Sequence, residues 1–121
     1  MARILVAEDD RSLLSFLQMA LEKAGHQVTT ADNGSDALLI LQKSSNNFDL
    51  LLSDIIMPGI DGIELSQRAV QLCPDLKVMF ITGFSAVSVG QNAAQLSQAK
   101  ILSKPFHLND LVANVETLLA A

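Results

Sequence analysis

Short apolar runs without a helical period alternate with longer segments that have one, along the whole of this 121-residue chain. Continuous apolar runs are typical of strands buried on both faces, as in a parallel sheet that is covered by helices. Alternation of such runs with helical segments predicts an α/β fold. We therefore predict strands at Ile4–Ala7, Val28–Thr30, Leu50–Ser53, Val78–Thr82 and Ile101–Ser103.

The segments between these strands carry helix-end signals. Gly25 follows the first as a residue suited to a helix C-terminus, and Asn33 is a good N-cap for the second. Asp61 and Glu64 have capping-box spacing at the start of the third, and Pro74 ends it. The apolar face of the first helix comprises Leu13, Leu14, Leu17, Leu21 and Ala24. That of the last comprises Leu108, Leu111, Val112, Val115, Leu118 and Leu119.

The fourth predicted helix, Ser85–Gln98, has the weakest signal. It contains Gly90 among several Ser, Gln and Asn residues, and an interior glycine costs about 1 kcal/mol relative to alanine. We expect a short or mobile element there. With this helix included, residues 1–121 are predicted to form a single domain with a flavodoxin-like, doubly wound, five-stranded parallel sheet and five helices. The strand order 2-1-3-4-5 is adopted by analogy with that fold.

Charge and composition argue against several classes of protein. The net charge is −5 and the eight basic residues are scattered, whereas a nucleic-acid binder normally shows a basic patch. No apolar run approaches the roughly 20 residues of a membrane span, and the one near the N-terminus is too short for a signal peptide. We therefore expect a cytoplasmic protein without membrane insertion or a nucleic-acid partner. Cys73 is the only cysteine, so neither an internal disulfide nor a cysteine-built zinc site is expected.

Polar side chains cluster at the carboxyl ends of the predicted strands, where open α/β sheets bind their ligands. Glu8–Asp10 follow the first strand, Asp54 follows the third, Thr82 ends the fourth and Lys104 comes after the fifth. Two carboxylates about 4 Å apart repel by roughly 4 kcal/mol at an effective dielectric constant of about 20. Such a site needs a raised pKa or a bound cation. Ligand sets made only of oxygen atoms favour a hard ion such as Mg²⁺, which also binds phosphate oxygens.

The same groups suit phosphoryl transfer. A carboxylate such as Asp54 can act as the nucleophile and become an aspartyl phosphate, while a metal ion and a lysine neutralise the charge on the transferring group. Each feature also has a simpler explanation. Taken alone, Glu8–Asp10 are equally well explained as a helix cap with solvated charge. Only the combination with Thr82 and Lys104 favours a phosphoryl-transfer site.

Four segments resemble the receiver domains of two-component response regulators, in order and with the usual spacing. They are Ile4–Asp10, Ser53–Gly62, Phe80–Gly83 and Ser103–Phe106. The resemblance covers the whole chain and implies the flavodoxin-like fold.

The resemblance also implies a role for each site residue. Asp54 is implied to be the phosphoacceptor. Asp9 is implied to bind Mg²⁺ directly, with assistance from Glu8, and the backbone carbonyl of Ile56 is implied to be a further ligand. The phosphoryl donor is then a histidine kinase or a histidine phosphotransferase.

Thr82 and Lys104 are implied to be the switch hydroxyl and the phosphate-binding lysine, with a cis peptide bond after the lysine. One position departs from the family pattern. Receivers usually carry an aromatic residue three positions before the lysine, and Ile101 stands there. Phe84, two residues after Thr82, is a candidate replacement, although local packing in a loop explains it equally well.

More narrowly, the stretches around Thr82 and Lys104 and the Leu-Ala-Ala ending are similar to the CpdR group, single-domain regulators that control proteolysis by the ClpXP protease. This implies a stand-alone regulator without an output domain. Its expected partners include ClpX or ClpXP and the protease's substrates. It would be no enzyme beyond accepting and losing its own phosphoryl group. A chemotaxis-type receiver, a phosphorelay intermediate and a binding module independent of phosphorylation are the alternatives.

Overall fold

The computed structural model describes residues 2–44, 47–83 and 100–120. Within them, parallel strands form one five-stranded sheet in the order β2-β1-β3-β4-β5, which confirms the predicted order. The strands are β1 (Arg3–Ala7), β2 (Gln27–Ala31), β3 (Leu50–Asp54), β4 (Lys77–Thr82) and β5 (Lys100–Ser103). Each predicted strand is therefore present, with ends that differ by at most one residue.

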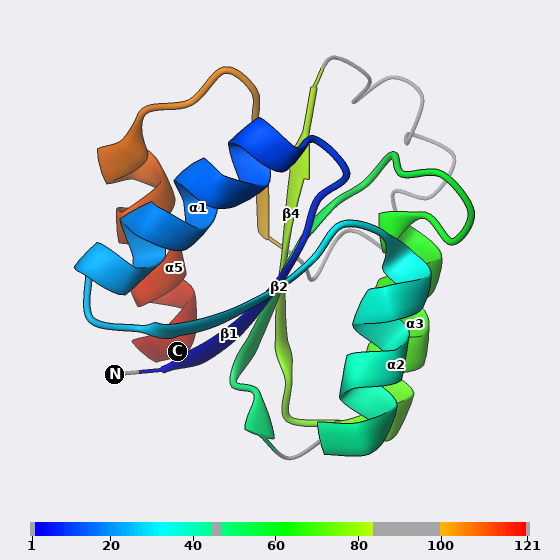
Figure 1. The fold of residues 1–121 in the computed structure, drawn as a ribbon. Coiled ribbons are helices and arrows are strands. Elements are labelled where there is room, and N and C mark those ends of the chain that lie inside the picture. Colours follow the sequence, from blue (N-terminus) through cyan, green and yellow to red (C-terminus); the bar gives the residue numbers. More distant parts are fainter. Residues whose placement is uncertain (1, 45–46, 84–99, 121) are drawn as a thin grey trace.

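Helices cover both faces of this sheet (Figure 1). The described helices are α1 (Arg11–Lys23), α2 (Gly34–Ser44), α3 (Gly62–Leu72) and α5 (Leu108–Ala120). Helices α1 and α5 pack on one face, and α2 and α3 on the other. The fourth predicted helix, Ser85–Gln98, lies outside the described residues, as does Phe84. In the described part of the chain, no helix is long and apolar enough to cross a membrane.

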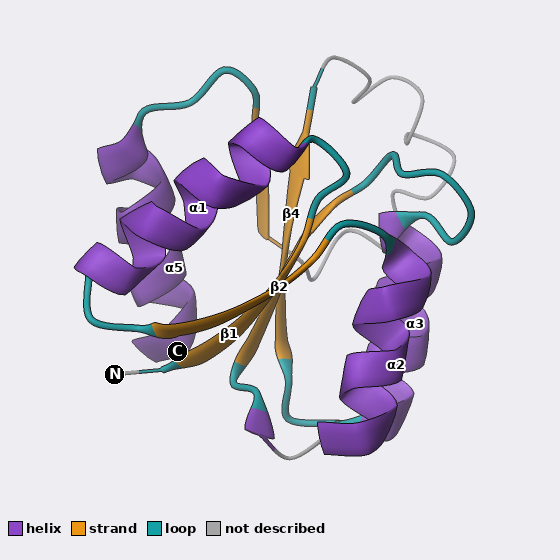
Figure 2. Cartoon of the chain, viewed as in Figure 1, coloured by secondary structure: helices purple, strands orange, loops and turns teal. Residues whose placement is uncertain are grey.

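The burial of the strands follows their place in the sheet. The central strand β3 is buried along its whole length, and β1 is buried except at Arg3. Edge strand β2 alternates between exposed and partly buried residues before it ends at Ala31. Two large apolar clusters fill the spaces between sheet and helices, one on each face. The alternation of strands and helices in Figure 2 is the arrangement that the apolar pattern predicts.

Side-chain caps start the helices where the sequence places them. The Asp10 carboxylate accepts the backbone N–H groups of Ser12 and Leu13, at 3.0 and 3.2 Å, and so caps α1. The Asn33 side chain likewise accepts the N–H of Asp36 at the start of α2. Gly25, just after α1, has a φ of +99°, a left-handed conformation that glycine adopts without strain.

Helix α3 begins as predicted but uses only half of the capping box. The Asp61 carboxylate accepts the N–H of Glu64 at 2.8 Å. The Glu64 carboxylate instead pairs with Arg68 one turn later, at 2.8 Å. Cys73 caps the other end of the helix and is buried, as expected of a small apolar residue.

Candidate functional site

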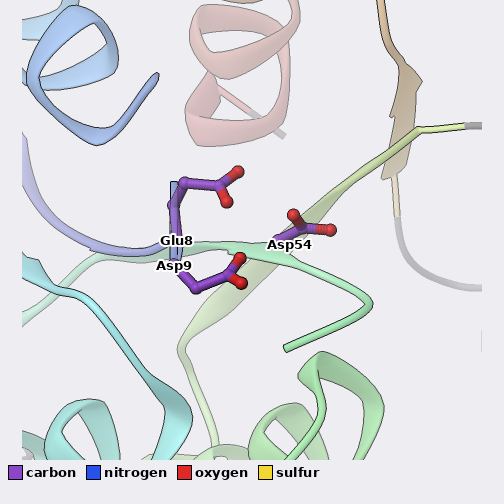
Figure 3. Close-up of side chains that lie close together, drawn as sticks. All are labelled: Glu8, Asp9 and Asp54. Carbon is purple, nitrogen blue, oxygen red and sulfur yellow. The ribbon is translucent and has the colours of Figure 1, made fainter. Parts of the chain in front are cut away.

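Three carboxylates meet where β1 and β3 end. Glu8 and Asp9 directly follow β1, and Asp54 ends the neighbouring β3. One oxygen from each lies within 4.8 Å of the others, and Figure 3 shows the three side chains close together. Glu8 and Asp54 are only 0% and 6% exposed, whereas Asp9 is open to solvent. The sequence prediction that these acids crowd together is confirmed.

Lys104 joins the two buried acids. Its Nζ donates to Glu8 Oε1 at 3.1 Å and to Asp54 Oδ2 at 3.0 Å. The backbone N–H of Lys104 donates to the carbonyl of Thr82 at 2.7 Å, which ties the end of β5 to the end of β4. The peptide bond between Lys104 and Pro105 is cis, as the resemblance implies. The lysine thus supplies one positive charge to a pocket that holds three carboxylates.

The protonation of Glu8 reflects this environment. Burial raises the pKa of Glu8 to about 7, and the charge of Asp54 adds to the increase, although hydrogen bonds from the Asp10 N–H and from Lys104 oppose it. Burial by itself would lower the pKa of Lys104, but its bonds to Asp54 and Glu8 outweigh burial and raise it. The pocket therefore holds its lysine charged and favours any further positive charge.

A buried hydroxyl stands at the end of β4. Thr82 is 2% exposed, and its Oγ1 has no hydrogen-bond partner among the residues that the structure describes. A buried polar group left without a partner costs about 1–3 kcal/mol. Thr82 Oγ1 is thus a donor available to an oxygen atom that enters the pocket.

The chain after Asp54 is held close to it. Asp54 Oδ1 accepts the backbone N–H of Ile56 at 3.2 Å, and the N–H of Gly62 donates to the carbonyl of Ile55 at 2.8 Å. A Cβ atom at Gly62 would lie 2.1 Å from the backbone oxygen of Asp54, so a larger residue does not fit there. The sequence analysis assigns no individual role to Gly62. Its only local signal is a glycine, a poor helix former, at the first position of α3.

The structure also shows where the other residues singled out in the sequence lie. The side chain of Asp10 caps α1, so the simpler explanation of the acidic run holds for that residue and not for its two neighbours. Ile101 pairs with Phe80 in the sheet, and its side chain is 39% exposed. Glu8, Asp9 and Asp54 together offer only oxygen ligands, a donor set that fits Mg²⁺.

Comparison with known proteins places this arrangement in a family. The sequence pattern of the response regulator receiver domain matches residues 4–116. The response regulator receiver protein CpdR of Brucella abortus (strain 2308) is 54% identical over 121 residues, which is 100% of this chain and 99% of that protein. The sensor kinase CckA of the same organism is 30% identical over 98% of this chain, which spans 12% of the kinase.

A solved structure shows the same fold with ligands in place. The response regulator protein TrrA of Thermotoga maritima, in complex with Mg²⁺ and beryllofluoride, superimposes with a TM-score of 0.83 and is 31% identical. The match covers 98% of this chain and 99% of that one. The two chains thus share the fold over almost their full lengths.

Proposed function

Because this chain belongs to the response regulator receiver domain family, we propose that it is a Mg²⁺-dependent switch that is phosphorylated on Asp54. The family match confirms the resemblance seen in the four sequence segments. Receiver domains are in general signalling modules rather than enzymes. The observation that carries the proposal is Lys104 Nζ, which lies 3.0 Å from Asp54 and 3.1 Å from Glu8 in a pocket of carboxylates.

The transfer itself needs little from the protein besides position and charge. An oxygen of the Asp54 carboxylate attacks the phosphorus of a phosphohistidine, a P–O bond forms, the P–N bond breaks, and the imidazole leaves. Lys104, already at Asp54, then pairs with the phosphoryl oxygens. The hydroxyl of Thr82, which has no partner within residues 2–44, 47–83 and 100–120, donates a hydrogen bond to the new phosphoryl group. The phosphoryl group therefore provides an acceptor for this buried donor. The new hydrogen bond favours movement of Thr82 towards Asp54.

Glu8, Asp9, Asp54 and the backbone carbonyl of Ile56 would hold the metal ion. When bound, Mg²⁺ supplies positive charge for the phosphoryl oxygens. Support for this site is the convergence of three carboxylate oxygens within 4.8 Å of one another. The homologous TrrA structure contains Mg²⁺ with beryllofluoride. The exposed Asp9 gives the ion a side from which to enter.

The switch would act through protein contacts in the cytoplasm. Its phosphoryl donor is a histidine kinase or a histidine phosphotransferase. For its output we infer control of ClpXP-dependent proteolysis, with the unphosphorylated form engaging ClpX. Full-length similarity to the CpdR protein supports this inference.

Beryllofluoride, which mimics an aspartyl phosphate, tests both the phosphoryl switch and the ClpXP inference. Calorimetry should detect its binding only with Mg²⁺ present, and not in Asp54→Asn. ClpX should be retained on immobilised wild-type protein and released when Mg²⁺ and beryllofluoride are added. If ClpX were retained equally with and without beryllofluoride, the ClpXP inference would be contradicted, but the phosphoryl switch would not. Absence of metal-dependent binding would contradict the switch itself.

A further inference from the structure

The outer edge of β2 has the features of a self-complementary interface. Strand β2 ends the sheet, and within the described residues no strand pairs with its outer side. Figure 1 shows this edge at the front of the molecule, between α1 and α2. We propose that β2 pairs antiparallel with β2 of a second copy of this chain, so that two sheets join across a two-fold axis. This inference does not depend on the proposed function.

The backbone of β2 determines which groups are available. The N–H of Gln27 donates inward to the carbonyl of Ala2 at 2.8 Å, and the carbonyl of Ala31 accepts the N–H of Glu8 at 3.1 Å. Because backbone groups of alternate residues point to the same side of a strand, Gln27, Thr29 and Ala31 face β1. The N–H and C=O groups of Val28 and Thr30 therefore face outward.

These outward groups match themselves in an antiparallel pair centred on Thr29. Val28 of one copy then lies opposite Thr30 of the other, and the two pairs exchange four hydrogen bonds. Thr29 lies opposite its own counterpart, and threonine pairs are favourable across strands. Gln27–Ala31 contains neither a lysine nor a proline, the residues that natural edge strands use to prevent such pairing.

Helix α2 adds charges that fit the same axis. Asp36 lies in its first turn and Lys43 in its last, on a stripe that runs through Leu39 and Ile40. Leu39 is 52% exposed beside the C-terminal half of the β2 edge, and Ile40 lines hollows against both halves. Antiparallel pairing would place Leu39 near its counterpart at the axis. Asp36 of each copy would then face Lys43 of the other.

Helix α1 repeats this pattern on the opposite face of the sheet. Arg11 and Ser15 line the hollow at the β2 edge, and their stripe continues at helical spacing through Gln18 to Glu22. A two-fold axis between Ser15 and Gln18 would bring Arg11 of one copy, which also pairs with Asp32 of its own chain at 3.0 Å, to Glu22 of the other. Both helices beside the edge thus have opposite charges at opposite ends, as an isologous contact requires.

Charge reversal tests the symmetry. Sedimentation velocity from micromolar to millimolar concentration should show wild type forming dimers. Asp36→Lys and Lys43→Asp should each raise the dimer Kd by about tenfold or more, because each places like charges at two symmetric points. The double variant Asp36→Lys/Lys43→Asp should restore dimers. Asp110→Lys, which also removes an acid from the first turn of a helix, is the matched control and should dimerise like wild type.

A cross-link tests the register. Thr29→Cys should form an intermolecular disulfide on oxidation, because its counterpart lies directly opposite at the axis. Gln27→Cys, on the same face but two residues away, should not, since its own counterpart would lie about 13 Å distant. Cys73 is buried and is not expected to compete. A strictly monomeric wild type, a double variant that stays monomeric, or equal cross-linking at positions 27 and 29 would overturn the proposal.

Discussion

The Nζ atom of Lys104 lies 3.0 Å from Oδ2 of Asp54, although the two residues are 50 positions apart in the chain. The contact spans three neighbouring parallel strands, because Asp54 ends β3, Lys104 follows β5, and β4 lies between them. The N–H of Lys104 donates to the carbonyl of Thr82 at the end of β4. The lysine therefore already occupies the place where a phosphoryl group on Asp54 would add negative charge. Phosphorylation would change the partner of Lys104 without requiring it to travel far.

Removing the lysine should separate its two effects. In Lys104→Met the carboxylates lose a competing cation, so the Kd for Mg²⁺ should fall by roughly tenfold. Labelling by acetyl phosphate should slow by about 10²–10³, because the charge on the transferring group is no longer neutralised. Calorimetry suits the binding measurement, since the chain has no Trp or Tyr for fluorescence. Lys23→Met, an exposed lysine at the end of α1, is the control. Weaker Mg²⁺ binding in Lys104→Met would contradict this view of the pocket.

Stability should depend on pH through Glu8. Its pKa rises from 4.5 to about 7 on folding, chiefly through burial. Its contribution to stability is therefore complete below about pH 4.5 and is lost as the pH rises through 7. In metal-free buffer, Glu8→Gln should be more stable than wild type at pH 8, by up to about 3 kcal/mol. The difference should largely vanish at pH 4.5.

Urea unfolding at both pH values measures this effect. Glu64→Gln, at a half-exposed glutamate on α3, serves as the control and should change little between them. Addition of Mg²⁺ at pH 8 should stabilise wild type more than Glu8→Gln. A Glu8→Gln protein that is less stable than wild type at pH 8 without metal would contradict this prediction. It would show that the hydrogen bonds to the Glu8 carboxylate outweigh the cost of burying its charge.

The hydroxyl of Thr82 should destabilise the free protein and stabilise the phosphorylated form. Thr82→Val keeps the shape of the side chain and removes Oγ1, which has no hydrogen-bond partner in the described part of the chain, so it should stabilise the free protein by about 1 kcal/mol. With Mg²⁺ and beryllofluoride the order should reverse. Thr82→Ser should behave like wild type in the second condition. Equal effects of Thr82→Val on both forms would argue against a switch role.

Gly62 should be intolerant of any side chain. Gly62→Ala would place a Cβ 2.1 Å from the backbone oxygen of Asp54, and the resulting shift should cost about 1–3 kcal/mol and weaken Mg²⁺ binding. Gly83→Ala is the matched control, because a Cβ there meets no atom of the described residues within 4 Å. Thermal unfolding and Mg²⁺ calorimetry should therefore separate the two variants. If both alanines behaved alike, the close contact at Gly62 would be irrelevant.

Sequence reasoning succeeded where physical rules act locally or along one strand. Apolar runs located each strand, and capping residues such as Asn33 and Asp61 located helix starts. The site followed from one topological rule, that parallel strands end at the same edge. That rule predicts that Glu8, Asp54 and Lys104 lie together, as the two hydrogen bonds of the Lys104 side chain confirm.

Contacts between distant segments could not be predicted in this way. The ring of His26 accepts the N–H of Ala2 at 3.1 Å and meets Glu116, which lies 90 positions away. Neither residue signals the other in sequence. The tight fit of Gly62 against Asp54 depends on packing that no sequence pattern indicates. The same holds for the Thr82 hydroxyl, which has no hydrogen-bond partner among the described residues. The acidic run alone does not separate Asp10 from its neighbours, whereas its bonds to Ser12 and Leu13 identify it as the cap of α1.

Mass spectrometry of the intact protein tests the central claim most directly. Wild type and Asp54→Asn are incubated with acetyl phosphate, each with and without Mg²⁺. The account predicts that wild type gains the mass of one phosphoryl group, only with Mg²⁺, and that Asp54→Asn gains none. Equal labelling of the two proteins, or full labelling of wild type without Mg²⁺, would contradict it.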